Sequence, residues 1–266
     1  MNQITLEALG TKWEILIDQK NLLFDTTEVK KIITTFEQNY SRFKPESLVS
    51  QINAGKKIKQ TTELQRLIAF GKELEVISEG YFQSQPGSNL ARLGYGSGTQ
   101  GLDFGAYGKG FLIDKVAEYL QKNNCLFFLI NAGGDIFATE KSNQDSWKVA
   151  LEHPTSNNTA IGTVLLKNKA LAASSPFKRS WNKNTQTNNH LINGKTGESI
   201  TQSRAVFVIS DTAQVADGLA TTLNIVPYQM IVTIAKKFNV EYLVFDQQGT
   251  MLSTHFNANL FTNSQQ

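Results

Sequence analysis

Two oxygen-bearing side chains, Asp217 and Thr221, stand four residues apart in a segment whose pattern predicts a helix. Side chains at this spacing project from the same face of a helix, one turn apart. A carboxylate and a hydroxyl are hard oxygen ligands of the kind that Mg²⁺ takes. The small neighbours Ala216, Gly218 and Ala220 let another backbone come close and favour a packed helix face. The pair is therefore a candidate metal site, with a surface contact between neighbouring helix turns as the alternative.

Two glycine-rich turns come earlier in the chain. The first leads from Asp103 to Lys109, and the second is N-A-G-G-D at 131–135, which ends in Asp135. Glycines let a backbone pass close to a ligand, and a helix that begins after them directs unpaired N–H groups at an anion. This arrangement suits a phosphorylated ligand, with Lys109 as its counter-charge. Neither turn has the spacing of a phosphate-binding or dinucleotide fingerprint. The second turn is equally well explained as a β-hairpin with glycines at positive φ.

A histidine is the third candidate group. His190 ends a polar stretch and is followed by Leu191 and a glycine-bearing turn. An imidazole titrates near neutral pH and can act as a base there. A hydrogen-bonded histidine at the end of a strand is the alternative explanation of the same position.

Apolar periodicity and helix caps predict the elements that hold these groups. Helices are expected to open at Thr26, Thr61 and Asp211 and to cover 109–122 and 229–238. Strands are expected as a pair within 3–18 that turns near Gly10, at 126–130, 147–151, 161–166 and 205–209, and as a final hairpin around 244–252. We expect an α+β fold in a single domain over 1–266, with mixed or antiparallel sheets flanked by helices.

Composition narrows the class of protein. The chain has 266 residues and a net charge of +3, with basic residues scattered rather than gathered in a stripe, which argues against nucleic-acid binding. A single cysteine, Cys125, excludes a disulfide scaffold. The sequence contains no pattern of a signal peptide and no apolar stretch of membrane-spanning length. The expected compartment is the cytoplasm, or the periplasm or a membrane surface if a leader has been trimmed.

Taken in order, these segments resemble the ApbE family of FAD:protein FMN transferases. The resemblance spans nearly the whole chain and is carried by six segments: 8–13 (A-L-G-T-K-W), 40–53, 103–114, 131–135, 190–197 (H-L-I-N-G-K-T-G) and 216–223 (A-D-G-L-A-T-T-L). The family pattern at 131–135, N-A-G-G-D, is present without a change.

The resemblance implies a Mg²⁺-dependent enzyme that moves FMN from FAD to a threonine hydroxyl of an acceptor flavoprotein and releases AMP. It implies that Mg²⁺ is held by the carbonyl of Ala106 and the side chains of Asp217 and Thr221, and that His190 is the candidate base. The residues implied to line the FAD site are Leu9, Phe43, Asp103, Lys109 and Leu191.

The chain departs from the family pattern in two places that bear on activity. Gln83 stands where the family has an acid that helps to hold the flavin. Asn193 replaces a further acid after the histidine, and Gly194 replaces the usual proline. If that acid tunes His190, an amide in its place lowers the basicity of the imidazole. Two alternatives follow: an FAD pyrophosphatase that uses water as acceptor, and a non-catalytic FAD-binding member of the family.

Overall fold

The computed structural model describes residues 1–20, 24–96, 98–156, 158–177, 179–183, 186–202, 204–246, 251–254 and 256–261. Within these residues the main sheet has eight strands, each antiparallel to its neighbours. In spatial order they are β1 (Asn2–Ala8), β2 (Thr11–Ile17), β3 (Phe128–Ala132), β4 (Asp135–Ala138), β7 (Lys169–Ser174), β10 (Arg204–Ser210), β11 (Glu241–Asp246) and β12 (Met251–Thr254). The predicted N-terminal strand pair and C-terminal hairpin are both present.

Two smaller sheets accompany the main one. The first contains β13 (Ala258–Leu260), β6 (Ala160–Leu166) and β5 (Trp147–Glu152) in that order. Its β5–β6 pair is antiparallel, as the alternation in the sequence predicts. The second is the hairpin of β8 (Ser180–Lys183) and β9 (Gln186–Asn189), which leads directly to His190.

The helices follow the sequence prediction closely where they are long. The described helices are α1 (Thr26–Tyr40), α2 (Leu48–Asn53), α3 (Thr62–Ile77), α4 (Gly87–Leu93), α5 (Gly108–Lys122), α6 (Ala213–Ile225) and α7 (Tyr228–Lys237). Thr61 and Thr212 cap α3 and α6 by accepting hydrogen bonds from backbone amides in the first turn. The short helices α2 and α4 were not predicted. Among the described helices, none is long and apolar enough to span a bilayer.

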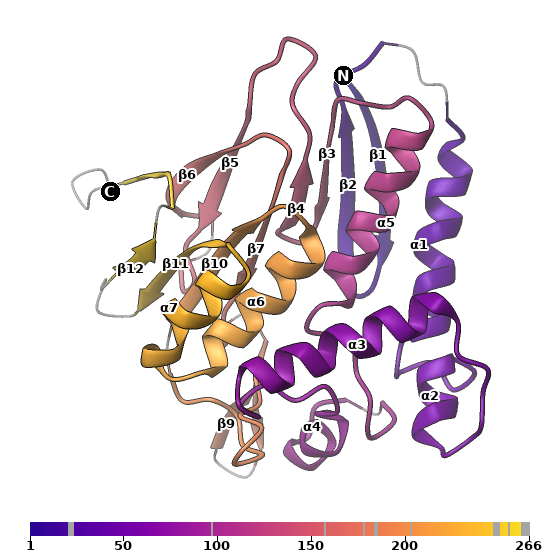
Figure 1. Ribbon diagram of the computed structural model, residues 1–266, viewed down its shortest axis with the longest axis vertical. Helices are drawn as coiled ribbons and strands as arrows, with labels where there is room; N and C mark the ends of the chain where they lie inside the picture. The colour runs from indigo at the N-terminus through magenta and orange to yellow at the C-terminus, as the bar shows by residue number, and fades with distance from the viewer. Residues whose placement is uncertain are drawn as a thin grey trace.

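The core lies in two layers, one on each face of the main sheet. On one face α1, α5, α6 and α7 cover the strands, and α3 runs across the ends of α5 and α6 (Figure 1). On the other face the β5–β6–β13 sheet packs through a second apolar cluster that includes Trp147, Leu171 and Phe207. The α+β class with antiparallel sheets flanked by helices is thus confirmed, while the extent of one domain over 1–266 stays a prediction.

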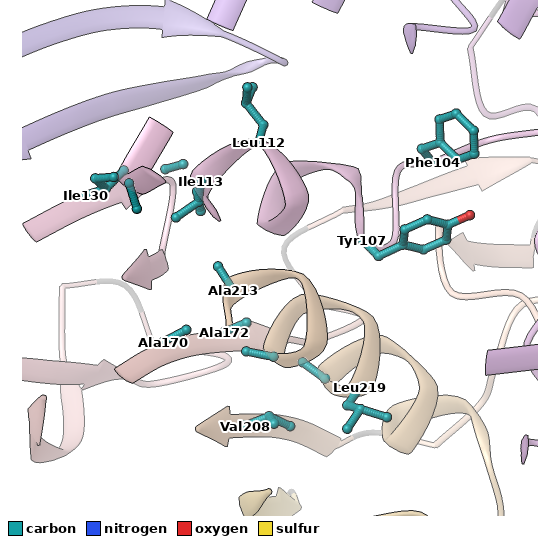
Figure 2. Packing of buried hydrophobic residues seen from close by; sticks show 14 of the residues in the cluster. Phe104, Tyr107, Leu112, Ile113, Ile130, Ala170, Ala172, Val208, Ala213 and Leu219 are labelled. Carbon is teal, nitrogen blue, oxygen red and sulfur yellow. The ribbon is translucent and has the colours of Figure 1, made fainter. Parts of the chain in front are cut away.

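Helices α5 and α6 pack against each other more extensively than any other two helices that the structure describes. Leu112 of α5 and Leu219 of α6 belong to the same buried cluster (Figure 2). A Cβ atom built on Gly110 of α5 would lie 2.2 Å from the carbonyl oxygen of Ala213, so only glycine permits this approach. At Gly218 the close neighbours are side chains of α3, those of Phe70 and Leu74, rather than the backbone that the small residues of α6 suggested.

Candidate active site

A pocket of about 680 Å³ opens where the N-terminus of α5, the β3–β4 turn, the end of β7 and the loop after β9 meet. The structure brings seven of the nine predicted site residues to its walls, namely Asp103, Ala106, Lys109, His190, Leu191, Asp217 and Thr221. The β3–β4 turn is the hairpin of the alternative explanation, with Gly133 and Gly134 at φ of +64° and +101°, and it also lines the pocket.

Leu9 and Phe43 are not among the residues that line this pocket. Leu9 forms the β1–β2 turn at a φ of +52°, and its amide donates to the Glu37 carboxylate at 3.3 Å. Phe43 is 53% exposed, and the guanidinium of Arg42 lies 4.3 Å from its ring centroid. Their predicted roles in the FAD site therefore have no support from the shape of the pocket, and they stay predictions.

Asp217 is fixed by a reciprocal pair of helix caps. The first amides of a helix lack partners inside the helix. The Gly110 amide of α5 donates to Asp217 Oδ2 of α6 at 2.9 Å. In return, Asp114 of α5 accepts from the amides of Ala213 and Gln214 at 2.7 and 2.9 Å. Each helix thus supplies the carboxylate that caps the other, which locks the α5–α6 contact and the position of Asp217.

A buried charge cluster surrounds this carboxylate. Lys109, predicted as a counter-charge to phosphate, forms an ion pair with Asp135 of the β3–β4 turn. Burial lowers the pKa of Lys109, but the carboxylates of Asp135 and Asp217 outweigh it and the pKa is raised. Burial, and then the neighbouring Asp135 carboxylate, raises the pKa of Asp217 well above its usual range. Two carboxylates share one ammonium, so the second negative charge is neutralised by the proton that the raised pKa of Asp217 favours, or by an added cation.

The donor set of the pocket fits a hard divalent cation. Asp217 supplies a carboxylate, Thr221 a hydroxyl and Ala106 a carbonyl, and all three residues line the pocket. The Thr221 hydroxyl makes no hydrogen bond within the part of the chain that the structure describes. No group of three or more His, Cys, Asp or Glu side chains suited to a metal occurs among the described residues. A cation here would therefore rest on mixed oxygen ligands, which suit Mg²⁺, and would offset the excess carboxylate charge.

His190 faces the same pocket as a neutral imidazole. Its Nδ1 lies 3.4 Å from the carbonyl oxygen of Arg179, an acceptor, and this contact favours the tautomer with the proton on Nδ1 and the lone pair on Nε2. Burial, followed by the charge of Arg179, lowers the pKa of His190 to about 4. The low basicity expected of this histidine is present, but Asn193 does not cause it. The Asn193 side chain instead accepts from the Lys195 amide at 3.0 Å.

The departures at positions 83 and 194 are in direct contact. Gln83 Nε2 donates to the Gly194 carbonyl at 2.7 Å. The Gly194 amide donates to the Tyr81 carbonyl at 2.7 Å, a bond that a proline at this position could not make. A Cβ on Gly194 would lie 2.4 Å from the Gly80 carbonyl oxygen. The amide at 83 and the glycine at 194 therefore work together to hold the loop that follows His190.

Arg179 is among the pocket residues that the sequence analysis did not single out. Arg179 lies between β7 and β8 and lines the pocket beside His190 and Lys109. It belongs to a polar stretch without periodicity, and its nearness to Lys109 depends on the β8–β9 hairpin, so no sequence signal marks it.

Comparison with known proteins places this geometry in a family. The sequence pattern of the ApbE family matches residues 9–101 and 95–244. The FAD:protein FMN transferase of Haemophilus influenzae is 32% identical over 148 residues, and that of Buchnera aphidicola is 26% identical over 155 residues. These matches cover 54% and 58% of this chain but 43% and 46% of the relatives, so the chain spans about half the length of the curated relatives it matches.

Solved structures show the same fold. The ApbE protein of Thermotoga maritima superimposes with a TM-score of 0.86 at 17% identity, covering 96% of this chain and 97% of that one. The flavin transferase ApbE of Vibrio cholerae superimposes with a TM-score of 0.80 at 19% identity, with the same two coverages. The sequence pattern matches well over half of the residues, and the fold agrees over nearly the whole length: the chain belongs to the ApbE family.

Proposed function

We propose that this chain is a Mg²⁺-dependent FAD:protein FMN transferase that transfers FMN from FAD to a threonine hydroxyl of an acceptor protein. The observation that carries the proposal is the convergence of Lys109, His190, Asp217 and Thr221 on one pocket from separate parts of the chain. The names of the curated relatives, FAD:protein FMN transferases, support the same activity.

The residues of the pocket have distinct parts in this reaction. The lowered pKa of His190 favours the neutral imidazole, whose Nε2 would take the proton from the acceptor threonine. The threonine oxygen then bonds to the phosphorus of the FMN half, while the bond from that phosphorus to the bridging oxygen breaks and AMP leaves. Asp217, Thr221 and the Ala106 carbonyl would hold the Mg²⁺, which neutralises charge on the pyrophosphate when it is bound.

Lys109 and Asp135 support this site rather than act on their own. The ion pair keeps the ammonium of Lys109 charged beside Asp217 and fixes the β3–β4 turn against the N-terminus of α5. Because both groups are mostly buried, with side chains 18% and 4% exposed, their separation would leave an uncompensated charge in the pocket wall.

The test is release of AMP from FAD, followed by chromatography with Mg²⁺ and with EDTA, together with intact mass of a candidate acceptor protein. Thr221→Val replaces the hydroxyl by a methyl of equal size and removes no structural hydrogen bond, so it should abolish most Mg²⁺-dependent turnover while the melting temperature is unchanged. Thr35→Val, on the exposed side of α1, is the matched control, because the Thr35 hydroxyl likewise makes no hydrogen bond with the described residues.

The outcomes separate the three functions considered. AMP with a mass gain of one FMN on the acceptor supports the transferase. AMP without any mass gain, at the same rate with and without acceptor, indicates a pyrophosphatase. Bound FAD with no AMP under either condition indicates a non-catalytic member, and full activity of Thr221→Val contradicts the cation assignment.

A further inference from the structure

Arg179 is a charged residue that neither the family motifs nor the proposed chemistry uses. It lies in the connection between β7 and β8, is exposed, and lines the same pocket as His190, Asp217 and Thr221. Its backbone carbonyl faces Nδ1 of His190 at 3.4 Å. Residue 179 therefore fixes the orientation of the imidazole through its main chain and presents its guanidinium to the pocket through its side chain.

The other charged walls of the pocket leave this guanidinium without a partner. Asp103 forms an ion pair with Arg42 at 2.8 Å, and Asp135 is paired with Lys109. Glu152, a further acid of the pocket, has an interaction of its own. The Arg179 side chain makes no ion pair or hydrogen bond with the described residues. Its charge lies close to two other groups of the pocket: it helps to lower the pKa of His190, and it opposes the carboxylates that raise the pKa of Lys109. A cation that lines the pocket beside a second cation, with no bound partner among the described residues, is arranged for an anion that enters from solution.

We propose that Arg179 binds the pyrophosphate of FAD, next to the phosphorus that His190 and the oxygen ligands of the pocket face. This inference rests on the proposed function and names one contact within it. A planar guanidinium donates two parallel hydrogen bonds to phosphate oxygens, whereas the ammonium of Lys109 is already engaged by a carboxylate. Because Arg179 both orients His190 and binds the phosphate, it would hold the base and the phosphorus in a fixed position relative to each other.

The experiment measures binding, so that it does not depend on turnover. The full chain, its Arg179→Gln and Arg179→Lys variants, and the control Arg66→Gln are titrated with FAD and with riboflavin by flavin fluorescence, and with ADP by calorimetry. Arg66 is a matched exposed arginine on α3 that does not line the pocket. Each titration is made in Mg²⁺ and in EDTA, and the melting temperature of every variant is recorded.

We expect Arg179→Gln to weaken FAD and ADP binding about tenfold, the scale of one charge-assisted contact, and to leave riboflavin binding within about twofold. The loss of affinity should also be seen in EDTA, because the contact between Arg179 and phosphate does not require the cation. Arg179→Lys should keep part of the affinity, and the control should bind like the wild type.

Each other outcome has a definite meaning. If wild type binds FAD and Arg179→Gln binds it equally well, the phosphate contact is wrong and the proposed function stands. If the variant binds FAD normally but transfers FMN more slowly to an acceptor, Arg179 instead contacts an acidic segment of that acceptor, which also overturns the inference. If wild type binds neither FAD nor ADP, the inference and the proposed function both fail.

Discussion

Gly110→Ala is the substitution for which the structure makes the sharpest prediction. The added Cβ would lie 2.2 Å from the Ala213 carbonyl oxygen and 2.8 Å from Asp217 Cβ. Ordinary contacts of this kind exceed 3 Å, so α5 and α6 must separate by about 1 Å. Overpacking on this scale costs about 3 kcal/mol, and alanine in place of glycine within a helix returns about 1 kcal/mol. The net loss of unfolding free energy should be about 2 kcal/mol.

The same displacement should reach the active site, because the Gly110 amide holds Asp217. A misplacement of about 1 Å at a catalytic group commonly costs about 100-fold in rate. We therefore expect urea unfolding to show the stability loss and AMP release at saturating FAD to fall by one to two orders of magnitude, roughly.

Gly108→Ala is the control within the same helix. Its added Cβ would meet the Phe104 Cβ at 3.0 Å and the Phe36 ring at 3.7 Å, so it needs a much smaller shift of the neighbouring backbone than the added Cβ at Gly110. It should cost much less than Gly110→Ala in both assays. If Gly110→Ala is as stable as the wild type, or Gly108→Ala is the more damaging of the two, the inferred contact between α5 and α6 is wrong.

Three further predictions concern groups that hold the site in place. Burial raises the pKa of Asp114 to about 6 in the fold, so its contribution to stability is full below about pH 4 and is lost as pH rises through 6. Between pH 4 and 7, the free energy of unfolding of the wild type should fall by about 2 to 3 kcal/mol relative to that of Asp114→Asn, as measured by urea unfolding at several pH values. A difference that does not change with pH would contradict this prediction. Arg204→Met should lower the free energy of unfolding by about 2 to 4 kcal/mol. The reason is that Nη2 of Arg204 donates to the carbonyls of Leu223, Asn224 and Val226 at the end of α6. A variant as stable as the wild type in urea unfolding would show that these bonds contribute nothing. Gln83→Glu restores the family's acid and should lower the free energy of unfolding by about 1 to 2 kcal/mol, since an ionised carboxylate cannot donate to the Gly194 carbonyl. An unchanged melting temperature would count against that hydrogen bond.

The sequence predicts the long elements because their signals are local. The helix from Thr62 carries its own N-cap at Thr61 and several turns of apolar periodicity, and the hairpin at 131–135 carries its glycines. The helices α2 and α4 have six and seven residues, too few for a periodic pattern to emerge, and they were not predicted.

The contacts that complete the site are nonlocal and escaped prediction for that reason. The ion pair of Lys109 with Asp135 depends on the packing of α5 beside the β3–β4 turn, which no spacing reveals. The approach of Arg179 to His190 depends on the β8–β9 hairpin, whose strands read as a polar loop. The sequence points to Asn193 as the cause of a low basicity of His190, whereas the main causes of its lowered pKa are burial and the charge of Arg179.

The proposed function gives Asp217 a second use beside its contact with α5, and this affects how other chains with this motif should be interpreted. One of its oxygens caps α5, so a relative without any transferase activity would still be under selection to keep the carboxylate for folding. Thr221 has no such second duty, because its hydroxyl is unbonded within the described part of the chain. If Thr221 holds the cation as proposed, the threonine is the informative position of the A-D-x-L-A-T pattern. Its loss would then mark a chain without the reaction, whereas a retained aspartate would indicate only that α5 and α6 still pack together.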